Sequence, residues 1–555
     1  MHYADGKDSS AGQVTSIASR VLAMSFIAGV AYMSLAIGVT SAAETTETAT
    51  TVEKSTAEAT PPPAPRSQST RHQLTLDGKM LNYTATVGWL ILKDDKKRKE
   101  SKDIKESKNS EEKPIARFGY TAYTLDGVKD PSHRPVTFAF NGGPGSSSIW
   151  LHMAVLGPKR VVVNDGGYAP PPPVQLVDNE FTILDATDIV LIDPVGTGFS
   201  KPLGDAEGKE FWGVDQDIES VGAFIQRYVT DNGRWGSPKY VLGESYGGIR
   251  GAGLANYLQS RLGMNLNGLI LVSPYFTFEA GSDGIGVDLP HALYLPTFAA
   301  TAAYYDALAE KPASLDAFLA EVERFAYDEY VPALLKGNSI PGEERQAIAA
   351  KLARYTGTTA EFWQRADLRV SHVQFLQELL RARGLIAGRI DARFAGPSLN
   401  PLNDVMDYDP FIPAVLPAFT AGFRAYLRSD LKFEAEDEYA AYGNLFKIWD
   451  WSHAQPGVDP EDYPKVPSPN LLPDLATALT MNPGLHLLVE QGLYDLATPS
   501  FALKYNLDHL RLSPEARQRI HVNPHAAGHM MYLNAAVAHQ FREHVVGFIR
   551  DTDRL

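Results

Sequence analysis

Residues 240–248 read Tyr-Val-Leu-Gly-Glu-Ser-Tyr-Gly-Gly, an apolar run that passes directly into a glycine-rich turn. The stretch that follows, Ile249–Leu262, has the pattern of a helix. A serine between a buried strand and a helix is typical of a nucleophile elbow, in which Gly243 and Gly247 leave room for the sharp turn. The sequence therefore predicts that the hydroxyl of Ser245 stands clear of a sheet and acts as a nucleophile.

Short apolar runs alternate with helical patterns on both sides of this turn. Such runs are typical of buried strands in a mostly parallel sheet. The runs are Val136–Phe140, Ile189–Ile192, Tyr240–Leu242, Leu269–Val272, Leu485–Val489 and Ile520–Val522. Val214–Thr230 predicts a helix between the second and the third of them. This alternation indicates an α/β fold in which helices flank the sheet.

The region before the first of these strands has a different pattern. Gln73–Leu76 and Met80–Leu92 predict a hairpin that turns at Asp77-Gly78. Ile115–Thr124 predicts a third strand. The lysine- and glutamate-rich stretch Lys93–Lys113 is interpreted as a solvated loop, with a basic binding patch as the alternative.

From Leu289 to Leu445 the sequence is largely helical, although it lies between two predicted strands of the sheet. Because open α/β sheets bind ligands at the carboxyl ends of their strands, we expect this insertion to form a lid there. A packing domain that does not touch the substrate is the alternative. The predicted domains are residues 71–288 and 446–555 for the two parts of the α/β body, and 289–445 for the lid.

The N-terminus has the features of an export signal. Val21–Val39 is almost entirely apolar, and Ser41-Ala42-Ala43 offers small residues for cleavage near Ala43. We therefore expect residues 1–43 to be a signal peptide for export to the periplasm or the extracellular space, with an uncleaved membrane anchor as the alternative. After cleavage, no stable membrane association is expected. Residues 44–70, rich in Thr, Glu, Ala and Pro, predict a disordered linker.

The amino-acid composition excludes several classes of partner and of chemistry. The net charge of the 555-residue chain is −15, which argues against nucleic acid and anionic lipid. The chain has no cysteine, so disulfides and thiolate chemistry are excluded. No group of His, Asp and Glu shows the spacing of metal ligands along the sequence, so neither a metal nor an organic cofactor is predicted. The oligomeric state stays open.

A serine nucleophile needs a base and a group that orients the base. Asp495 follows the predicted strand Leu485–Val489, and His529 follows Ile520–Val522. Both residues are expected on loops at the carboxyl ends of strands, where side chains converge. The chain order Ser245, Asp495, His529 is the order that a nucleophile elbow requires.

Other residues near these positions are alternatives. His525 lies four residues before His529 and could be the base, but the glycine at position 528 gives His529 the freer loop. Asp450 and Asp459 precede the last long strand and are expected at the surface or in the lid. Asp193 is followed by a proline, and we expect it to have a structural role.

Acyl transfer also requires hydrogen-bond donors for the oxyanion, each contributing about 3–4 kcal/mol of transition-state stabilisation. The backbone N–H of Tyr246, directly after the nucleophile, is one expected donor. The second should come from the loop after the strand Val136–Phe140, which reads Asn-Gly-Gly-Pro-Gly-Ser-Ser-Ser over Asn141–Ser148. The glycines of this loop allow its backbone to approach a bound carbonyl.

Four motifs together resemble the serine carboxypeptidases, the carboxypeptidase Y-like family. The motifs are Asn141–Ser148, Asp193–Ser200, Gly243–Gly248 and Gly528-His529-Met530, in that family's order. The resemblance covers about Gln73 to the C-terminus. It implies an α/β-hydrolase fold with a helical lid insertion, and an enzyme that releases single residues from the C-termini of peptides through an acyl-enzyme intermediate.

The resemblance also implies roles for particular residues. Ser245, Asp495 and His529 would form the catalytic triad. The oxyanion donors would be Gly143 and Tyr246. The terminal carboxylate of the substrate would be bound by Asn141, Gly142 and Glu244. The chain departs from the family's usual pattern at Ala139, Ser146 and Val155, so the carboxylate-binding network can be arranged differently here.

The role of Glu244 has a consequence for pH. Two carboxylates share a hydrogen bond only if one is protonated, so the pKa of Glu244 should be raised when substrate is bound. We therefore expect peptide hydrolysis to be favoured at acidic pH. The alternative is that Glu244 only fills a position of the turn. For the whole chain, the alternatives to a carboxypeptidase are an esterase or acyltransferase on the same fold, and a non-catalytic binding protein.

Overall fold

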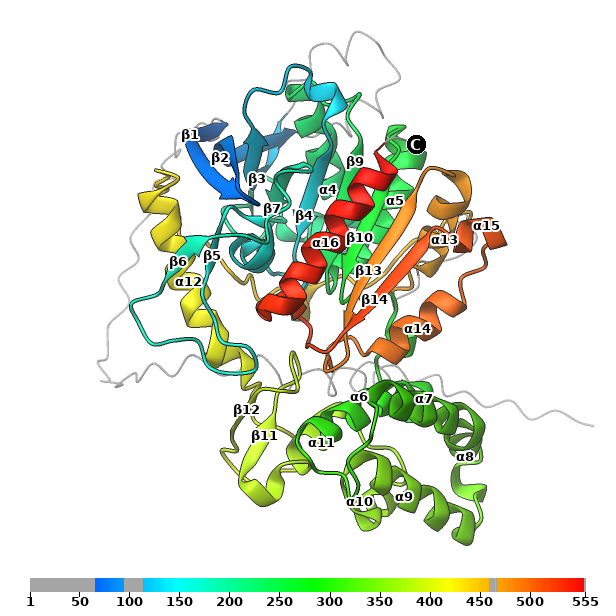
Figure 1. The fold of residues 1–555 in the computed structure, drawn as a ribbon. Helices are drawn as coiled ribbons and strands as arrows, with labels where there is room; N and C mark the ends of the chain where they lie inside the picture. The colour runs from blue at the N-terminus through cyan, green and yellow to red at the C-terminus, as the bar shows by residue number, and fades with distance from the viewer. Residues whose placement is uncertain (1–64, 94–112, 459–464, 466–467, 554–555) are drawn as a thin grey trace, which may run out of the picture.

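The computed structural model describes residues 65–93, 113–458, 465 and 468–553 (Figure 1). The predicted signal peptide, residues 44–64 of the predicted linker and nearly all of the predicted Lys93–Lys113 loop lie outside the described residues. Among the helices that the structure does describe, we find none with the length and hydrophobicity of a membrane-spanning segment.

A ten-stranded sheet runs through the body of the protein, in the order β1-β2-β3-β7-β4-β9-β10-β13-β14, with β8 beside β3 (Figure 1). Six consecutive strands of this order, β7 to β14, are parallel. They are β4 (Val136–Phe140), β7 (Asp188–Ile192), β9 (Lys239–Glu244), β10 (Gly268–Val272), β13 (His486–Gly492) and β14 (Ile520–His525). All six predicted strands are confirmed. Except at the edge strand β14, their side chains are nearly all buried, which is why they form continuous apolar runs.

Three long antiparallel strands precede this sheet: β1 (Arg66–Leu76), β2 (Lys79–Lys93) and β3 (Pro114–Leu125). The turn residues Asp77 and Gly78 have φ values of 50° and 74°, as a two-residue hairpin turn requires. The prediction of a disordered linker up to residue 70 is wrong from Arg66 onward, because Arg66 already pairs with Trp89. The first half of β1 is exposed and polar, so it lacks the apolar alternation of a half-buried strand.

Helices cover both faces of the sheet (Figure 1). One face packs against α4 (Val214–Asp231), α5 (Gly247–Leu262) and α13 (Leu472–Met481), with α14 (Ser500–Asp508) at its edge. The other packs against α16 (Ala535–Thr552), the short α3 (Ile149–Leu151) and α12 (Phe411–Ser429). The predicted helix Val214–Thr230 is thus confirmed as α4. Smaller elements are β5 (Lys159–Val161), β6 (Leu176–Asp178), β8 (Lys201–Pro202) and α15 (Pro514–Arg517).

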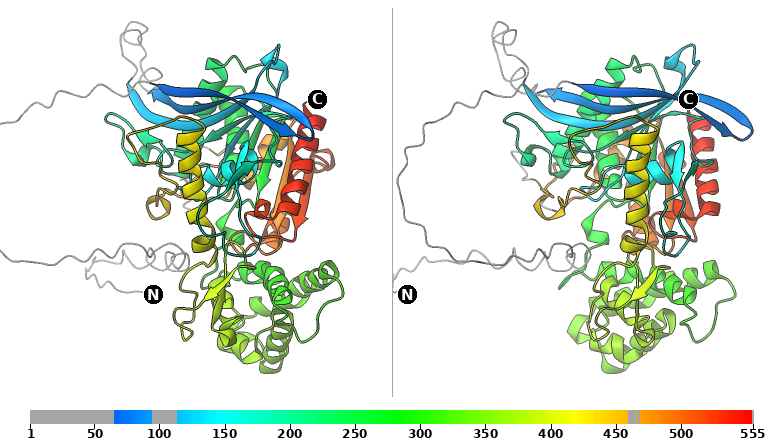
Figure 2. Two further views of the ribbon diagram at one scale, coloured as in Figure 1. Left: turned by 60° about the vertical axis from the view of Figure 1, so that its left-hand side comes forward. Right: turned by 90° about the vertical axis from the view of Figure 1, so that its left-hand side faces the viewer.

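A helical unit lies below the sheet in Figures 1 and 2. It comprises α6 (Leu289–Tyr304), α7 (Leu315–Phe325), α8 (Val331–Leu335), α9 (Gly342–Thr356), α10 (Ala360–Arg365), α11 (His372–Glu378) and the two-stranded sheet of β11 (Leu385–Ala387) and β12 (Ala395–Pro397). Its hydrophobic core also contains Tyr494, Leu496 and Phe501, which follow β13. The unit is therefore anchored to the segment that follows the carboxyl end of β13.

The predicted lid range, residues 289–445, is too long. Helix α12 packs on the α/β body, where Phe419 lies 4.9 Å from Trp150 and Phe423 lies 5.2 Å from His152, between ring centroids. After α12, the chain returns along the glycine-rich loop, and Ser147 N donates to Ala441 O at 3.0 Å. The helical pattern of α12 indicates a buried face, but it does not indicate which of the two units that face contacts.

Candidate active site

Ser245 lies on the sharp turn between β9 and α5, with a φ of 63°. A non-glycine residue in this left-handed region is strained and has to be held by its surroundings. The backbone N–H of Ser245 donates to Val272 O at 3.0 Å, and its carbonyl accepts from Gly248 N and Tyr275 N. A Cβ atom at Gly243 would lie 2.4 Å from Gly247 O, so the crossing of strand and helix requires glycine there.

His529 and Asp495 form the expected pair of base and orienting acid. His529 Nδ1 lies 2.7 Å from Asp495 Oδ2, and both side chains are buried. Asp495 Oδ1 accepts hydrogen bonds from Ala497 N at 2.8 Å and Thr498 N at 2.9 Å, and Oδ2 accepts from Thr498 Oγ1 at 2.6 Å. Burial lowers the pKa of His529, but the charge and the hydrogen bond of Asp495 outweigh it and raise that pKa.

The predicted nucleophile, Ser245, and the predicted base, His529, lie on loops on either side of β10. Ser245 N binds the last residue of β10, and Ser273, the residue after it, donates its hydroxyl to His529 O at 2.8 Å. The side chain of Ser245 is half-buried. Within the described ranges, no hydrogen bond joins Ser245 Oγ to His529, and such bonds are often formed only with bound substrate. The triad therefore stays a prediction, with two of its members paired in the structure.

The glycine-rich loop lies against the nucleophile turn. A Cβ atom at Gly142 would lie 2.5 Å from Tyr246 N and 2.6 Å from Glu244 O, so the backbones make the closest approach that glycine allows. Gly143, the next residue, has a φ of 108°. This contact brings the two predicted oxyanion residues, Gly143 and Tyr246, to adjacent backbone segments.

A buried ion pair is hydrogen-bonded to the backbone of the glycine-rich loop. Arg250 Nε lies 2.7 Å from Asp217 Oδ2, both side chains are almost fully buried, and Arg250 Nη1 donates to Asn141 O at 2.8 Å. The guanidinium also lies over the rings of Phe140 and Tyr246. One cation thus connects the glycine-rich loop with the turn that carries the nucleophile.

Glu244, directly before the nucleophile, has a buried carboxyl group. Burial raises its pKa to about 7, while the charge of His529 and the hydrogen bond from Tyr532 oppose this rise. The Asn141 side chain lies beside Glu244 and Tyr532, and its Oδ1 accepts from Leu151 N at 3.1 Å. Asn141 Nδ2 is buried and has no hydrogen-bond partner among the residues the structure describes. A buried donor without a partner costs free energy, so the site favours an acceptor here.

The remaining candidates from the sequence are His525, Asp193, Asp450 and Asp459. His525 is bound to Glu490 at 2.5 Å, so the alternative that it is the base is not supported. Asp450 is exposed and accepts from Ser452, and Asp459 lies outside the described residues. Asp193 has the expected structural role: it is buried and accepts two hydrogen bonds from Ser148, at 2.9 and 2.8 Å.

Several residues of the site were not predicted. They are Thr498, Ser273, Tyr532 and the pair Arg250–Asp217. Only the ion pair had a signal, since Asp217 and Arg250 are charged positions within predicted helices that have a buried face. The structure also brings Glu490, His525 and His544 together as potential metal ligands, although their spacing along the chain gave no indication of a metal site.

The chain resembles known proteins in its overall fold and in part of its sequence. The overall fold is that of the α/β-hydrolases. It is shared with the crystal structure of KEX1(ΔP), a prohormone-processing carboxypeptidase from Saccharomyces cerevisiae, at a TM-score of 0.51 and 15% identity over 84% of this chain and 91% of that chain. The predicted α/β-hydrolase fold is thereby confirmed.

At the sequence level, the serine carboxypeptidase family model matches residues 120–286. Serine carboxypeptidase-like 36 and serine carboxypeptidase-like 33 from Arabidopsis thaliana are 30% and 32% identical to this chain over 178 and 169 residues. These matches cover 31% and 28% of this chain, and about a third of each relative, 34% and 33%. The resemblance to the serine carboxypeptidases is therefore confirmed over residues 120–286. The family-model match includes the glycine-rich loop and Ser245, whereas Asp495 and His529 lie beyond it.

Proposed function

We propose that the protein is a serine-type carboxypeptidase that releases C-terminal residues from peptides through an acyl-enzyme intermediate. The observation that carries this proposal is the buried Glu244 carboxyl, one residue from Ser245, with the buried Asn141 amide beside it. A buried acid that is mainly neutral below about pH 7 can donate a hydrogen bond to a free C-terminal carboxylate, which supports this preference. Peptides are the proposed partners, and neither nucleic acid nor a cofactor is required.

The proposed reaction begins at the hydroxyl of Ser245. His529 Nε2 accepts the proton of Ser245 Oγ as that oxygen attacks the terminal peptide carbonyl, and the backbone N–H groups of Gly143 and Tyr246 stabilise the oxyanion. The proton then passes from His529 to the leaving amine of the terminal residue. Water attacks the remaining acyl-enzyme by the same route. Asp495 holds the imidazole in one orientation throughout.

Recognition of the terminal carboxylate is proposed for Asn141, Gly142 and Glu244. Protonated Glu244 donates a hydrogen bond to the substrate carboxylate, and Asn141 Nδ2 donates a second one. Because Glu244 has a pKa of about 7, it is mainly protonated below that pH, which supports a preference for acidic pH. Protonation also removes a negative charge that raises the pKa of His529, so the base remains neutral more readily.

The proposal is tested with a blocked peptide that has a free C-terminus, with products identified by mass spectrometry. We expect one amino acid to leave at a time, and we expect Ser245→Ala to abolish both this release and labelling by a fluorophosphonate. Equal hydrolysis of the C-terminally amidated peptide would instead favour the esterase or acyltransferase. A folded protein that is not labelled would favour the binding protein.

Export is a separate part of the proposal. The apolar run before Ala43 supports a signal peptide and a periplasmic or extracellular location. The intact mass of the protein recovered outside the cytoplasm tests this. Loss of the first 43 residues is expected, and a full-length chain found in the membrane fraction would indicate an anchor.

A further inference from the structure

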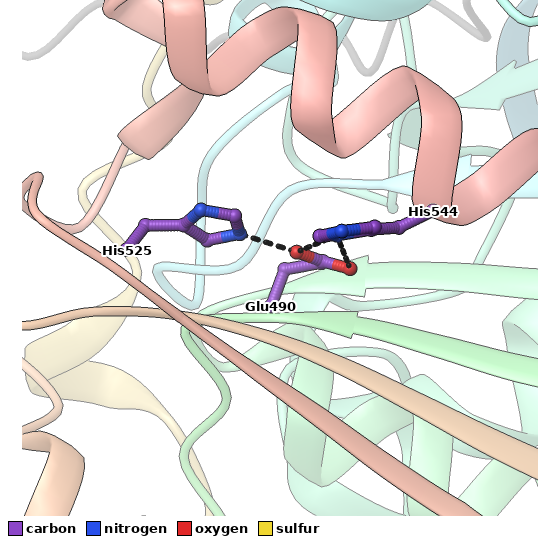
Figure 3. A group of neighbouring side chains, drawn as sticks. All are labelled: Glu490, His525 and His544. Carbon is purple, nitrogen blue, oxygen red and sulfur yellow. Dashed lines mark hydrogen bonds and ion pairs between the residues drawn. The ribbon is translucent and has the colours of Figure 1, made fainter.

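A group of three side chains lies between the sheet and the C-terminal helix, apart from the proposed catalytic residues (Figure 3). Glu490 comes from β13, His525 from the end of β14, and His544 from α16. His525 Nε2 lies 2.5 Å from Glu490 Oε2, and His544 Nδ1 lies 3.1 and 3.2 Å from the two carboxylate oxygens. Both imidazoles thus direct a nitrogen atom toward one carboxylate.

The surroundings separate these three residues from an ordinary surface ion pair. The side chains of Glu490 and His525 are 0% and 2% exposed, whereas that of His544 is 36% exposed, so the group is open to solvent on one side. Asn523 Nδ2 donates to Glu490 Oε1 at 2.8 Å and fixes the carboxylate from the neighbouring strand. Hydrogen bonds of this kind to a ligand carboxylate are common around metal ions in proteins.

The geometry fits a small transition-metal ion. One ligand atom from each residue lies within 4.8 Å of the others. Tetrahedral Zn²⁺ with bonds of about 2.0–2.2 Å needs ligand atoms about 3.3 Å apart. The nitrogen of His544 is already at this separation from Glu490, and the nitrogen of His525 is closer. Two imidazole nitrogens and one carboxylate oxygen form a ligand set that suits Zn²⁺, with water from the open side as a fourth ligand.

We propose that Glu490, His525 and His544 bind one divalent transition-metal ion, with Zn²⁺ as the best match to the ligands. Such an ion would join β13, β14 and α16. The carbonyl of Glu490 accepts from Ser273 N at 2.8 Å, and Ser273 in turn binds the backbone of His529. The ion would therefore stabilise the part of the body that supports the catalytic loops, without taking part in the acyl transfer.

The test measures zinc bound by protein purified without a polyhistidine tag, stripped with a chelator, reloaded with Zn²⁺ and desalted. We expect about one zinc per chain by elemental analysis and a higher Tm in the loaded protein than in the stripped one. X-ray absorption at the zinc edge should give nitrogen and oxygen ligands at about 2.0–2.2 Å.

Variants locate the site. His544→Gln changes a partly exposed ligand and should lower zinc affinity by at least about tenfold and remove the Tm increase. Glu490→Gln should do the same, and fluorophosphonate labelling shows whether each variant is folded. The matched control is His539→Gln, an exposed histidine of the same helix, which should bind zinc like the unmodified protein. Equal zinc binding by His544→Gln and the unmodified protein, or no zinc retained by the latter, would overturn the proposal.

Discussion

The two buried carboxylates of the proposed active site differ in the number of donors they face. Asp495 accepts from two backbone N–H groups, from the Thr498 hydroxyl and from His529. Glu244 accepts a hydrogen bond from Tyr532 and has the Asn141 side chain beside it, and burial raises its pKa to about 7. Burial alone therefore does not determine the role of a carboxylate. A carboxylate with many donors orients a base, and one with few donors is ready to bind a second carboxylate as a neutral acid.

The largest losses of activity should result from single substitutions of Ser245 or Asp495. Ser245→Ala should lower kcat by about 10⁶, since no other group replaces the attacking hydroxyl. Asp495→Asn should lower it by about 10⁴, because an amide favours the wrong imidazole tautomer. Steady-state kinetics on a peptide with a free C-terminus measure both. Asp450→Asn, at an exposed rival position, is the control, and an equal loss in that variant would contradict the assignment.

The role of Glu244 can be tested by removing the hydroxyl of Tyr532, which donates a hydrogen bond to its carboxylate. The hydrogen bond from Tyr532 lowers the pKa of Glu244, so Tyr532→Phe should raise that pKa above about 7. The pH at which peptide hydrolysis declines should then move upward by about one unit. Profiles of kcat/KM against pH measure this shift, with Tyr327→Phe in the lid as the control. A shift to lower pH would show that the hydroxyl does not stabilise the charged form.

Burial and hydrogen-bond partners also act against each other on the pKa of a buried histidine elsewhere in the body. His453 lies between Asp215, at 2.6 Å, and Asp474, at 2.9 Å. Burial lowers its pKa, but the two carboxylates outweigh burial and raise it to about 9. Protonated His453 therefore stabilises the fold fully below its ordinary pKa of 6.5, and this contribution is lost as pH rises through 9.

His453→Gln should accordingly lower the Tm by several degrees at pH 6, and the difference from the unmodified protein should shrink between pH 6.5 and pH 9. Thermal unfolding across this range measures the change. His509→Gln, at an exposed position, is the control. A Tm difference that grows with pH would show that the neutral imidazole is the stabilising form.

The smallest effect on the pH profile should result from substitution of Arg389, a half-buried residue of the lid segment. The carbonyl of Arg389 accepts a hydrogen bond from Leu496 N at 3.0 Å. The charge of Arg389 opposes the rise in the pKa of His529. Arg389→Gln should therefore raise that pKa and move the acidic limb of the kcat/KM profile upward by less than about one pH unit. Arg383→Gln, at an exposed position nearby, should leave the limb in place.

The sequence predicts the parts of the fold in which local pattern and tertiary environment agree. The run Val136–Phe140 coincides with β4, because a strand buried on both faces is apolar throughout. The start of β1 is not visible in the sequence because its side chains face solvent, and the predicted lid is too long because the apolar face of α12 does not indicate what it packs against.

The residues of the site also differ in whether the sequence indicates them. Ser245 is visible because its turn imposes glycines on either side of it. Tyr532 and Thr498 are not visible, because their hydroxyls find partners only when distant loops meet at the end of the sheet. The group at Glu490 has no signal at all, since His525 and His544 lie 35 and 54 residues from it along the chain.

The most direct test of the central claim, that Glu244 binds the terminal carboxylate as a neutral acid, compares one peptide with a free C-terminus and its amidated form. The ratio of their kcat/KM values is measured across pH in the unmodified protein and in Glu244→Gln. We expect a ratio well above one at acidic pH that falls as pH rises through about 7, and a flat profile of this ratio in Glu244→Gln. A ratio near one at every pH in the unmodified protein would contradict it.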